Sequence, residues 1–197
     1  MKQAIKSDNF AEKYIELDLR FQELLNIEFD ECTFVKCDFS NTKFKNCIFH
    51  SCTFLECNLS LVNVVNSKFL EIAFIDCKVI GIDWTKASWN SLIKTPMKFE
   101  RSIINSSSFY GLDLKGMILK ESEAKDVDFR ETDLSEADFS YSDFSDTSFL
   151  HTNLTRVNFS YAKNFNIDIQ ANILKGAIFS RYDAIRLLSA FEIEFVE

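Results

Sequence analysis

The stretch from Phe29 to Leu59, FDECTFVKCDFSNTKFKNCIFHSCTFLECNL, repeats with a period of five residues. Its large apolar side chains stand at every fifth position, at Phe29, Phe34, Phe39, Phe44, Phe49, Phe54 and Leu59. A period of five matches neither the 3.6-residue period of an amphipathic helix nor the alternation of an ordinary strand. The stretch is therefore a tandem repeat, and the repeat decides the fold.

The same frame is predicted to continue to Phe179 without a slip. It contains 31 positions, and 28 of them carry a large apolar side chain; the exceptions are Lys94, Ala124 and Asn164. The residue two positions before the large one is mostly compact, and the residue just before it is often Asp or Asn. Each unit therefore reads small, polar, large, polar, polar, and we expect the small and the large side chains to face inward.

These units resemble the A(D/N)LXX motif of the pentapeptide-repeat family over most of the chain. The resemblance implies an all-β solenoid, a right-handed quadrilateral β-helix in which each pentapeptide forms one side and four form a coil. Physical considerations agree, because a five-residue unit cannot bury its own apolar face without neighbours above and below it. At a strand spacing of about 4.8 Å, about eight coils would form a rod roughly 37 Å long.

In such a rod, residues 20 apart in the sequence stack in columns. Two predicted inward columns follow from this count. The first contains Phe29, Phe49, Phe69, Trp89, Phe109, Phe129, Phe149 and Ile169, and the second contains Phe39, Leu59, Val79, Phe99, Leu119, Phe139, Phe159 and Phe179.

All six cysteines occupy the small inward position of the repeat: Cys32, Cys37, Cys47, Cys52, Cys57 and Cys77. No pair has the Cys-x-x-Cys spacing of a zinc site. Three of them would stack at a separation within disulfide range, but their side chains would run parallel and a reducing cytosol disfavours the bond. We interpret them as compact buried apolar residues, and expect no metal and no cofactor.

The repeat divides the chain into three regions. Residues 1–15 are off the pattern and are predicted to form an N-terminal arm or cap, since the open edge of a solenoid needs protection. Residues 16–180 are predicted to form the β-helix. One irregular turn is expected at 92–98, where a lysine falls on the inward frame and the only proline follows; its projecting residues would be Lys94, Thr95, Pro96, Met97 and Lys98. Because the frame returns at Phe99, no net insertion is expected.

Residues 181–197 change period. Residues 181–191 have helical spacing with two apolar faces, and residues 192–197 alternate like a short strand. One helix face can close the coil, while the other needs a second partner. The alternatives are a cap and a homodimer interface. The interface residues would be Tyr182, Ile185, Leu187, Leu188, Phe191, Ile193 and Phe195.

The net charge of −8 is concentrated in residues 121–150, which contain ten acidic and two basic residues. We name the ten the acidic belt: Glu121, Glu123, Asp126, Asp128, Glu131, Asp133, Glu136, Asp138, Asp143 and Asp146. Along the rod axis this belt would match the charge density of duplex DNA, which carries one charge per about 1.7 Å, but it would be spread over four faces, so that any single face carries less. The other interpretation is that Asp before the large residue belongs to the repeat consensus and is simply solvated.

Several functional classes are disfavoured. The two histidines, His50 and His151, follow inward residues and should face solvent, and no catalytic motif is present, so we expect no enzyme activity. The acidic field has the wrong sign for direct nucleic-acid binding. No apolar run is long enough to span a membrane, and the first residues lack the apolar core of a secretory signal. A cytoplasmic protein is expected.

Particular stretches resemble the topoisomerase-protecting branch of the family, which includes the Qnr and MfpA proteins and, most similar of all, the albicidin-resistance protein AlbG. They are Asn58-Leu59-Ser60-Leu61, Phe74-Ile75-Asp76-Cys77-Lys78, Asp83-Trp84-Thr85, Phe99-Glu100-Arg101, Ser108-Phe109-Tyr110-Gly111-Leu112 and Asn166-Ile167-Asp168-Ile169. The resemblance implies a dimeric DNA mimic, joined C-terminus to C-terminus, that binds DNA gyrase and topoisomerase IV and protects them from a poison. Qnr proteins carry long projecting loops, and the short turn at 92–98 favours a natural toxin over a quinolone. The alternative is a scaffolding β-helix without a topoisomerase role.

Overall fold

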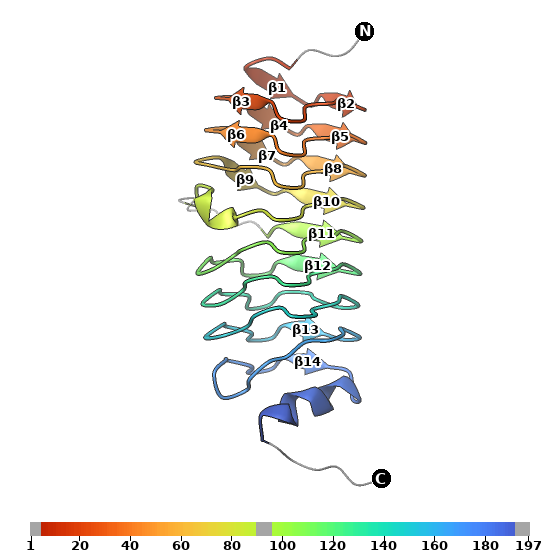
Figure 1. The fold of residues 1–197 in the computed structure, drawn as a ribbon, viewed down its shortest axis with the longest axis vertical. Coiled ribbons are helices and arrows are strands. Elements are labelled where there is room, and N and C mark those ends of the chain that lie inside the picture. Colours follow the sequence, from red (N-terminus) through yellow and green to blue (C-terminus); the bar gives the residue numbers. More distant parts are fainter. Residues whose placement is uncertain (1–4, 90–95, 192–197) are drawn as a thin grey trace.

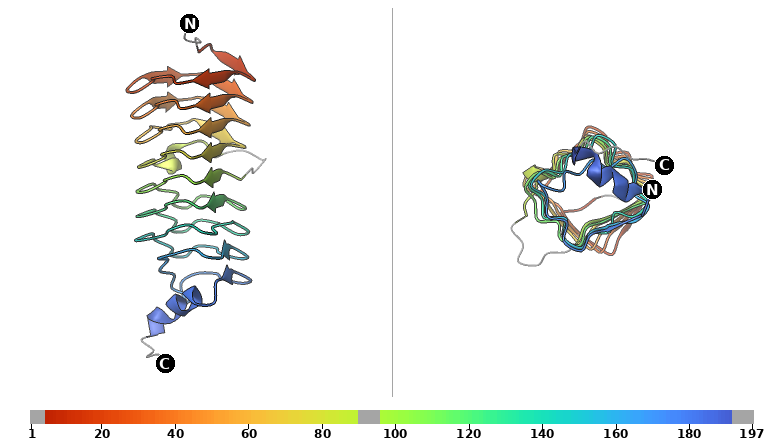
Figure 2. Two further views of the ribbon diagram at one scale, coloured as in Figure 1. Left: turned by 90° about the vertical axis from the view of Figure 1, so that its right-hand side faces the viewer. Right: turned by 90° about the horizontal axis from the view of Figure 1, so that it is seen from below.

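The protein is a rod of stacked four-sided coils (Figures 1 and 2), in a computed structural model that describes residues 5–89 and 96–191. Seen along its axis, the chain traces a quadrilateral (Figure 2, right). All strand pairs are parallel and join residues one coil apart, such as Phe34 and Phe54. The predicted right-handed quadrilateral β-helix is confirmed.

We number the four sides in chain order as faces 1 to 4, beginning with the strand that follows Glu12. Face 1 carries the longest sheet: β2 (Lys13–Ile15), β5 (Thr33–Val35), β8 (Thr53–Leu55), β10 (Ala73–Ile75), β11 (Lys98–Glu100) and β12 (Ile118–Lys120). Lower on the same face lie β13 (Asn158–Phe159) and β14 (Ile178–Phe179). Face 3 carries β3 (Glu23–Leu25) and β6 (Lys43–Lys45), and face 4 carries β1 (Asp8–Phe10), β4 (Glu28–Asp30), β7 (Ile48–His50) and β9 (Lys68–Leu70). Face 2 is held by isolated parallel bridges such as Asp38 to Asn58.

The core is a set of ladders in which like residues stack from coil to coil. On face 1 the ring centroids of Phe34 and Phe54 lie 4.7 Å apart, and those of Phe54 and Phe74 lie 5.1 Å apart. The six cysteines are buried, as predicted, and all of them are free thiols. Burial raises the pKa of the Cys52 thiol to about 12, so it stays protonated. The described residues contain no group of side chains suited to hold a metal ion.

The corners of the coil are made by residues in the left-handed conformation. They follow most of the large inward residues by two positions, and all four glycines of the chain lie among them. At Gly81 a side chain would be strained twice, because φ is +68° and an added Cβ would lie 2.7 Å from Leu61 Cδ2. Most other corners use Asn, Asp, Glu or Ser, and a few use large residues such as Phe21 and Tyr141. Polar corner residues explain how so many turns are made with so few glycines.

One coil is longer than the others, which corrects the prediction of no net insertion. Phe74 of β10 pairs with Phe99 of β11, a separation of 25 residues instead of 20. The two predicted columns are therefore wrong below this point: Trp84, not Trp89, stacks on Phe109, at 5.9 Å. An insertion of one whole pentapeptide keeps the period of five but moves every later residue to the next face. The insertion therefore cannot be detected from the five-residue period of the sequence.

The repeat also begins earlier and ends less regularly than predicted. Residues 8–15, expected in a cap, already form β1 and β2, which pair with β4 and β5. Near the other end the frame slips by one: Asn164 is exposed, and Phe165 and Ile167 are buried in its place. An amide side chain is costly to bury without partners, so the chain shifts until an apolar residue faces the core.

A 3-10 helix, η2 (Asp183–Phe191), follows β14 and lies across the C-terminal end of the rod (Figure 1). A second, short 3-10 helix, η1 (Trp84–Lys86), lies within the long coil, between β10 and β11. The predicted strand at 192–197 lies outside the described residues. Within the described part of the chain, neither helix approaches the length and apolarity needed to cross a bilayer.

Candidate functional site

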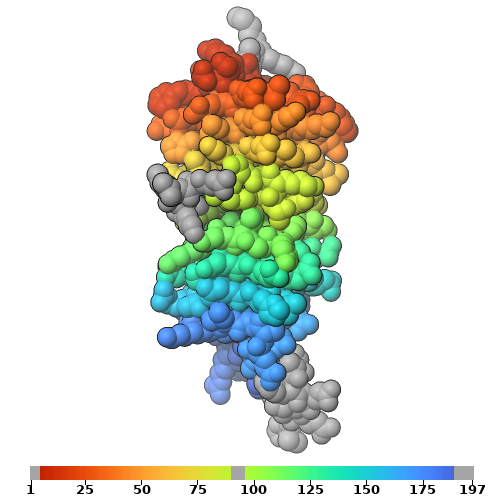
Figure 3. Space-filling model, turned by 90° about the vertical axis from the view of Figure 1, so that its left-hand side faces the viewer, coloured from red at the N-terminus to blue at the C-terminus, as the bar shows by residue number. Residues whose placement is uncertain are grey.

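The ten residues of the acidic belt wrap around the rod instead of gathering on one face. They lie in its C-terminal half, in the turquoise to light-blue part of Figure 3. The positions of the repeat distribute them as follows: Asp138 on face 1, Glu123 and Asp143 on face 2, Asp128 on face 3, Asp133 on face 4, and Glu121, Asp126, Glu131, Glu136 and Asp146 at corners. The count over residues 121–150 therefore describes a ring and not a patch.

Half of the belt is ion-paired, often to cations from outside residues 121–150. Lys115 and Arg156 both pair with Glu136, and Lys120 pairs with Asp138 at 3.6 Å. Within the belt, Arg130 pairs with Asp128 at 2.8 Å, and Lys125 lies 3.0 Å from Glu123 and 3.8 Å from Asp143. Residues 20 apart are neighbours in space, so a window of consecutive residues overstates the local charge. All these pairs are largely exposed and contribute little to stability.

Four belt aspartates have a structural task. The Oδ1 atoms of Asp128, Asp133, Asp138 and Asp143 each accept a hydrogen bond from the backbone N–H two residues later, at 2.9 to 3.2 Å. At Asp133, partial burial opposes ionisation, but hydrogen bonds from Ser135 and Asn153 outweigh it and the pKa is lowered. These carboxylates support the interpretation that Asp before the large residue belongs to the repeat itself.

The structure does bring four belt carboxylates together on one side. Glu123 and Asp143 are neighbours on face 2, and Asp126 and Asp146 are exposed at the corner that follows it. We name these four residues the acidic edge. Within the described residues no cation pairs with Asp126 or Asp146, and only Ser106 Oγ donates to Asp126, at 3.1 Å. Glu121 and Glu131 are also exposed and have no cation partner among the described residues, but each is the only belt carboxylate of its corner column. Asp126 and Asp146 are the one pair of such carboxylates stacked at a common corner, and they make the acidic edge the part of the belt that we consider for a partner.

The predicted projecting turn is mostly part of the coil. Met97 is buried and Lys98 opens β11, where its Nζ lies 3.0 Å from Glu100 Oε1, so the prediction that these two project is wrong. Pro96 is exposed. Lys94 and Thr95 lie outside the described residues.

The residues predicted to form a dimer interface fall into three groups. Tyr182 and Ile185 are exposed, at 82% and 47% of their surface. Leu187 packs against the core and Leu188 is half-buried. The Phe191 side chain, Ile193 and Phe195 lie outside the described residues. The helix therefore presents one apolar side to the coil and another to solvent.

Sequence reasoning missed exposed aromatic residues near the same end. Tyr141 and Tyr161 stack on the outside of the rod with ring centroids 4.8 Å apart, and both are more than half exposed. Ile173 and Ile178 of the last coil are also exposed. The repeat could have predicted their exposure, because both tyrosines follow an inward phenylalanine by two positions. Most residues at that position of the repeat are polar.

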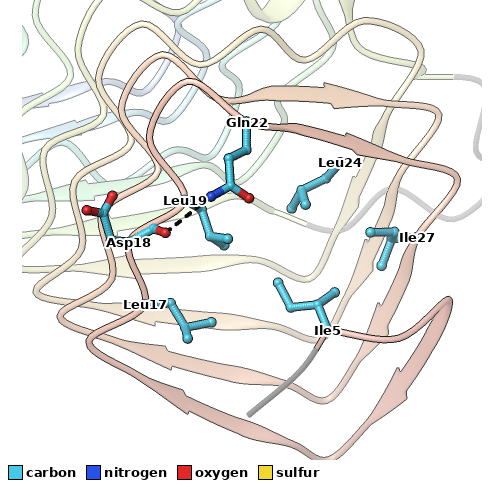
Figure 4. Close-up of a pocket in the computed structure, with 7 residues that line it drawn as sticks. All are labelled: Ile5, Leu17, Asp18, Leu19, Gln22, Leu24 and Ile27. Atoms are coloured by element: carbon cyan, nitrogen blue, oxygen red, sulfur yellow. Dashed lines mark hydrogen bonds between the residues drawn. The ribbon is translucent and has the colours of Figure 1, made fainter. Parts of the chain in front are cut away.

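The N-terminal end of the rod has a hollow of about 360 Å³ where the first coil is open (Figure 4). Five aliphatic side chains line it: Ile5, Leu17, Leu19, Leu24 and Ile27. Asp18 and Gln22 stand at its rim, where Gln22 Nε2 donates to the Asp18 carbonyl at 3.5 Å. Neither histidine lines this hollow; His50 pairs with Asp30 on the outside of face 4, at 2.7 Å. The hollow has the composition of an uncovered core end.

Comparison with known proteins agrees with this geometry. A family model described as a pentapeptide repeat region matches residues 27–109, and one described as pentapeptide repeats (8 copies) matches residues 132–163. No curated protein sequence matches the chain.

Solved structures show the same fold. A trypsin-treated variant of QnrB1, a plasmid-mediated fluoroquinolone resistance protein, matches with a TM-score of 0.68 and 20% identity over 93% of this chain and 100% of its own. HetL, a pentapeptide repeat protein involved in heterocyst differentiation regulation from the cyanobacterium Nostoc sp. strain PCC 7120, matches with a TM-score of 0.56 and 13% identity over 88% of this chain and 87% of its own. The two family models together match more than half of the chain, and the coil is built from the same five-residue unit throughout. The chain therefore belongs to the pentapeptide-repeat family.

Proposed function

We propose that the protein imitates duplex DNA, binds DNA gyrase, and protects it from a poison. Three observations support this: the resemblance of particular stretches to the topoisomerase-protecting branch, the likeness of the fold to QnrB1 over nearly the whole chain, and the acidic edge. The same chemistry would extend to topoisomerase IV. The protein would act as a cytoplasmic homodimer, without a cofactor and without touching nucleic acid itself.

The acidic edge is the observation that carries the proposal. Asp126 and Asp146 stand one coil apart on an exposed corner, and Glu123 and Asp143 repeat the spacing on the adjoining face. Coils are separated by about 4.8 Å, whereas one DNA strand carries a phosphate per about 3.4 Å of axis. Lys125 offsets part of the charge of Glu123 and Asp143, but the stacked carboxylates of Asp126 and Asp146 have no cation partner among the described residues and approach the charge spacing of one DNA backbone. A topoisomerase surface that binds phosphates would attract them.

The poison we favour is a natural toxin of the albicidin kind. The inserted segment in the long coil amounts to five residues, which is short compared with the projecting loops of Qnr proteins. Quinolone protection remains the second possibility to be tested.

Gyrase supercoiling with purified protein tests the function. The protein is titrated with and without albicidin or ciprofloxacin, and supercoiled product and cleavage complexes are measured. We expect recovery of supercoiling, or fewer cleavage complexes, at micromolar protein. Unchanged levels with both poisons and without poison would reject the gyrase proposal.

Neutralising the exposed corner is the sharpest test of the acidic edge. The double variant Asp126→Asn, Asp146→Asn removes two charges and keeps the shape, and asparagine accepts the left-handed conformation found at both positions (φ 56° and 58°). We expect the protein concentration for half-maximal effect on gyrase to rise at least tenfold, with the fold unchanged. Glu31→Gln, at a corner near the other end of the rod, is the matched control and should have no effect. An unaltered response of the double variant would exclude the acidic edge but not gyrase binding.

The dimer proposal rests on the exposed side of η2. Ile185→Asp places a charge on the side of the helix that faces solvent and leaves Leu187 against the core. If two copies meet through this helix, light scattering should show the mass of a dimer for the unmodified protein and of a monomer for the variant. Arg186→Ala, an exposed neighbour, should keep the dimer. A dimer mass that survives Ile185→Asp would contradict this interface.

A scaffolding role is the alternative. It is favoured by the interactions that the belt carboxylates make within the rod. Several of them accept hydrogen bonds from backbone N–H groups or pair with lysine and arginine of neighbouring coils. The likeness of the fold to HetL, whose description concerns regulation of differentiation, points the same way. A protein that leaves gyrase unaffected in every arm of the supercoiling assay would leave this alternative as the better account.

A further inference from the structure

The outer surface of face 1 is apolar over the first four coils. Its strands are regular, and each presents two side chains outward around one inward aromatic residue. Eight outward positions exist there, and only Lys13 carries a charge. The other seven are Ile15, Thr33, Val35, Thr53, Leu55, Ala73 and Ile75. We name these seven residues the apolar strip. Ile15 is 56% exposed and the others are half-buried.

The repeat does not require this composition. Face 4 of the same coils is built from equally regular strands, yet five of its eight outward positions are polar or charged: Asp8, Glu28, Asp30, His50 and Lys68. Strand propensity could explain the Thr, Val and Ile residues of the apolar strip. It would act equally on face 4, however, and it does not explain Leu55 or Ala73. A parallel sheet is normally covered on both sides, and here the rod covers only the inner side. The composition of the apolar strip therefore suits a contact.

The corners beside the apolar strip are acidic. Before each strand stand Ala11, Glu31, Ser51 and Glu71, and after each stand Glu16, Lys36, Glu56 and Asp76. Five of these eight residues are carboxylates and one is a cation. Lys36 lies 3.8 Å from Glu56, and Arg101 of the next coil lies 2.8 Å from Asp76. These two cations offset Glu56 and Asp76, so the eight corner residues together with Arg101 keep a net charge of −3, five carboxylates against two cations. The complementary partner has an apolar stripe flanked by positive charge.

The dimensions of the apolar strip exclude some occupants. Four coils at about 4.8 Å and three residues at about 3.3 Å make the strip roughly 19 Å long and 10 Å wide, which matches the diameter of a helix, about 10–12 Å, and is narrow for the face of a globular partner. A second copy would also bring acidic margins against acidic margins. A helix along the rod axis fits better, because its pitch of 5.4 Å nearly matches the coil spacing. About 13 residues of helix span the strip at 1.5 Å per residue.

The lower end of the apolar strip has a place for a larger side chain. A hollow of about 350 Å³ lies beside Ala73, between Pro96 and Ile118. A bulky apolar residue near one end of the helix could seat there, as anchor residues do in transient interfaces. We propose that the apolar strip docks an amphipathic helix of a partner protein, with one apolar stripe flanked by lysine or arginine.

A designed peptide tests the proposal directly. The probe is a fluorescein-labelled 16-residue helix with one leucine stripe and lysines on both sides, and fluorescence anisotropy reports its binding to the full-length protein. We expect saturable binding in the micromolar range. Glutamates in place of the lysines, or the same composition with the leucines dispersed, should weaken binding at least tenfold. Failure of the lysine peptide to bind at 1 mM, or equal binding of the dispersed peptide, would overturn the proposal.

Matched variants locate the contact. Leu55→Asp should weaken binding of the lysine peptide at least tenfold, whereas Ile80→Asp should not, although both residues follow an inward residue by one position and are half-buried. Leu55→Ser is a milder second variant, and circular dichroism confirms that each is folded. Equal binding by Leu55→Asp and Ile80→Asp would overturn the assignment. So would a self-associated form of the unmodified protein that only Leu55→Asp dissociates, since it would identify a second copy as the occupant.

Discussion

Phe54→Ala is expected to lower the free energy of unfolding by about 3–5 kcal/mol, the range for a fully buried aromatic residue. Phe54 has no exposed surface. Its ring stacks between those of Phe34, at 4.7 Å, and Phe74, at 5.1 Å, and it meets Phe39 edge-on at 5.8 Å. Removing it interrupts a ladder in three consecutive coils. Stacked contacts of this kind add to the area that each ring buries.

Urea unfolding followed by circular dichroism measures the effect. Phe10→Ala is the control, because Phe10 lies on β1 and is 66% exposed, and its replacement should change stability by less than about 0.5 kcal/mol. In a solenoid each coil contacts only its neighbours, so native-state hydrogen exchange should show the loss first in β5, β8 and β10. Similar costs for the two variants would contradict the ladder as the source of stability.

Trp84→Ala is expected to cost about 3–5 kcal/mol as well, but Trp84→Phe should change stability by less than about 1 kcal/mol. Trp84 is fully buried in the long coil, stacked on Phe109 at 5.9 Å and edge-on to Phe69 at 5.1 Å. Its Nε1 has no acceptor among the described residues. An unpaired buried donor costs free energy, and phenylalanine removes this donor while it keeps an aromatic ring in the stack.

The comparison of the two variants isolates the ring from its N–H group. Both are measured by thermal and urea unfolding, with Trp89→Phe as a control, since Trp89 Nε1 does donate, to the Trp84 carbonyl at 2.8 Å. Trp89→Phe should cost about 1 kcal/mol, the value of one hydrogen bond. If Trp84→Phe is as damaging as Trp84→Ala, the indole fills space that a phenyl ring cannot.

The inward and outward sides of the unit could be predicted residue by residue. Phe29, Cys32 and Phe34 are buried as the repeat requires, because a period of five allows only one consistent set of side chains to face a common axis. The insertion in the long coil could not be predicted, since five added residues leave that period intact. Only the pairing of Phe74 with Phe99 reveals it.

The acidic belt shows that a sum of charges along the sequence does not give the local charge on the surface. A sum over residues 121–150 predicted a charge of −8, but charge is felt through space, and the cations of Lys115, Lys120 and Arg156 lie one coil away from their acidic partners. Four exposed belt carboxylates have no cation partner among the described residues: Glu121, Asp126, Glu131 and Asp146. Only Asp126 and Asp146 stand one above the other at the same corner. The apolar strip could not be predicted from the sequence for the same reason. Its residues Val35, Leu55 and Ile75 are 20 positions apart in the chain and become neighbours only when the coils stack.

The sequence by itself determined the period, nearly all of the inward residues and thus the solenoid, because each five-residue unit must bury the same two of its side chains. The tertiary structure alone decided which units stack on which, and with it the columns below Phe74, the ion pairs, the acidic edge and the apolar strip. The physical reason is that neighbours along the rod are a coil apart in the sequence. One added unit among thirty changes every such neighbour without altering the repeat.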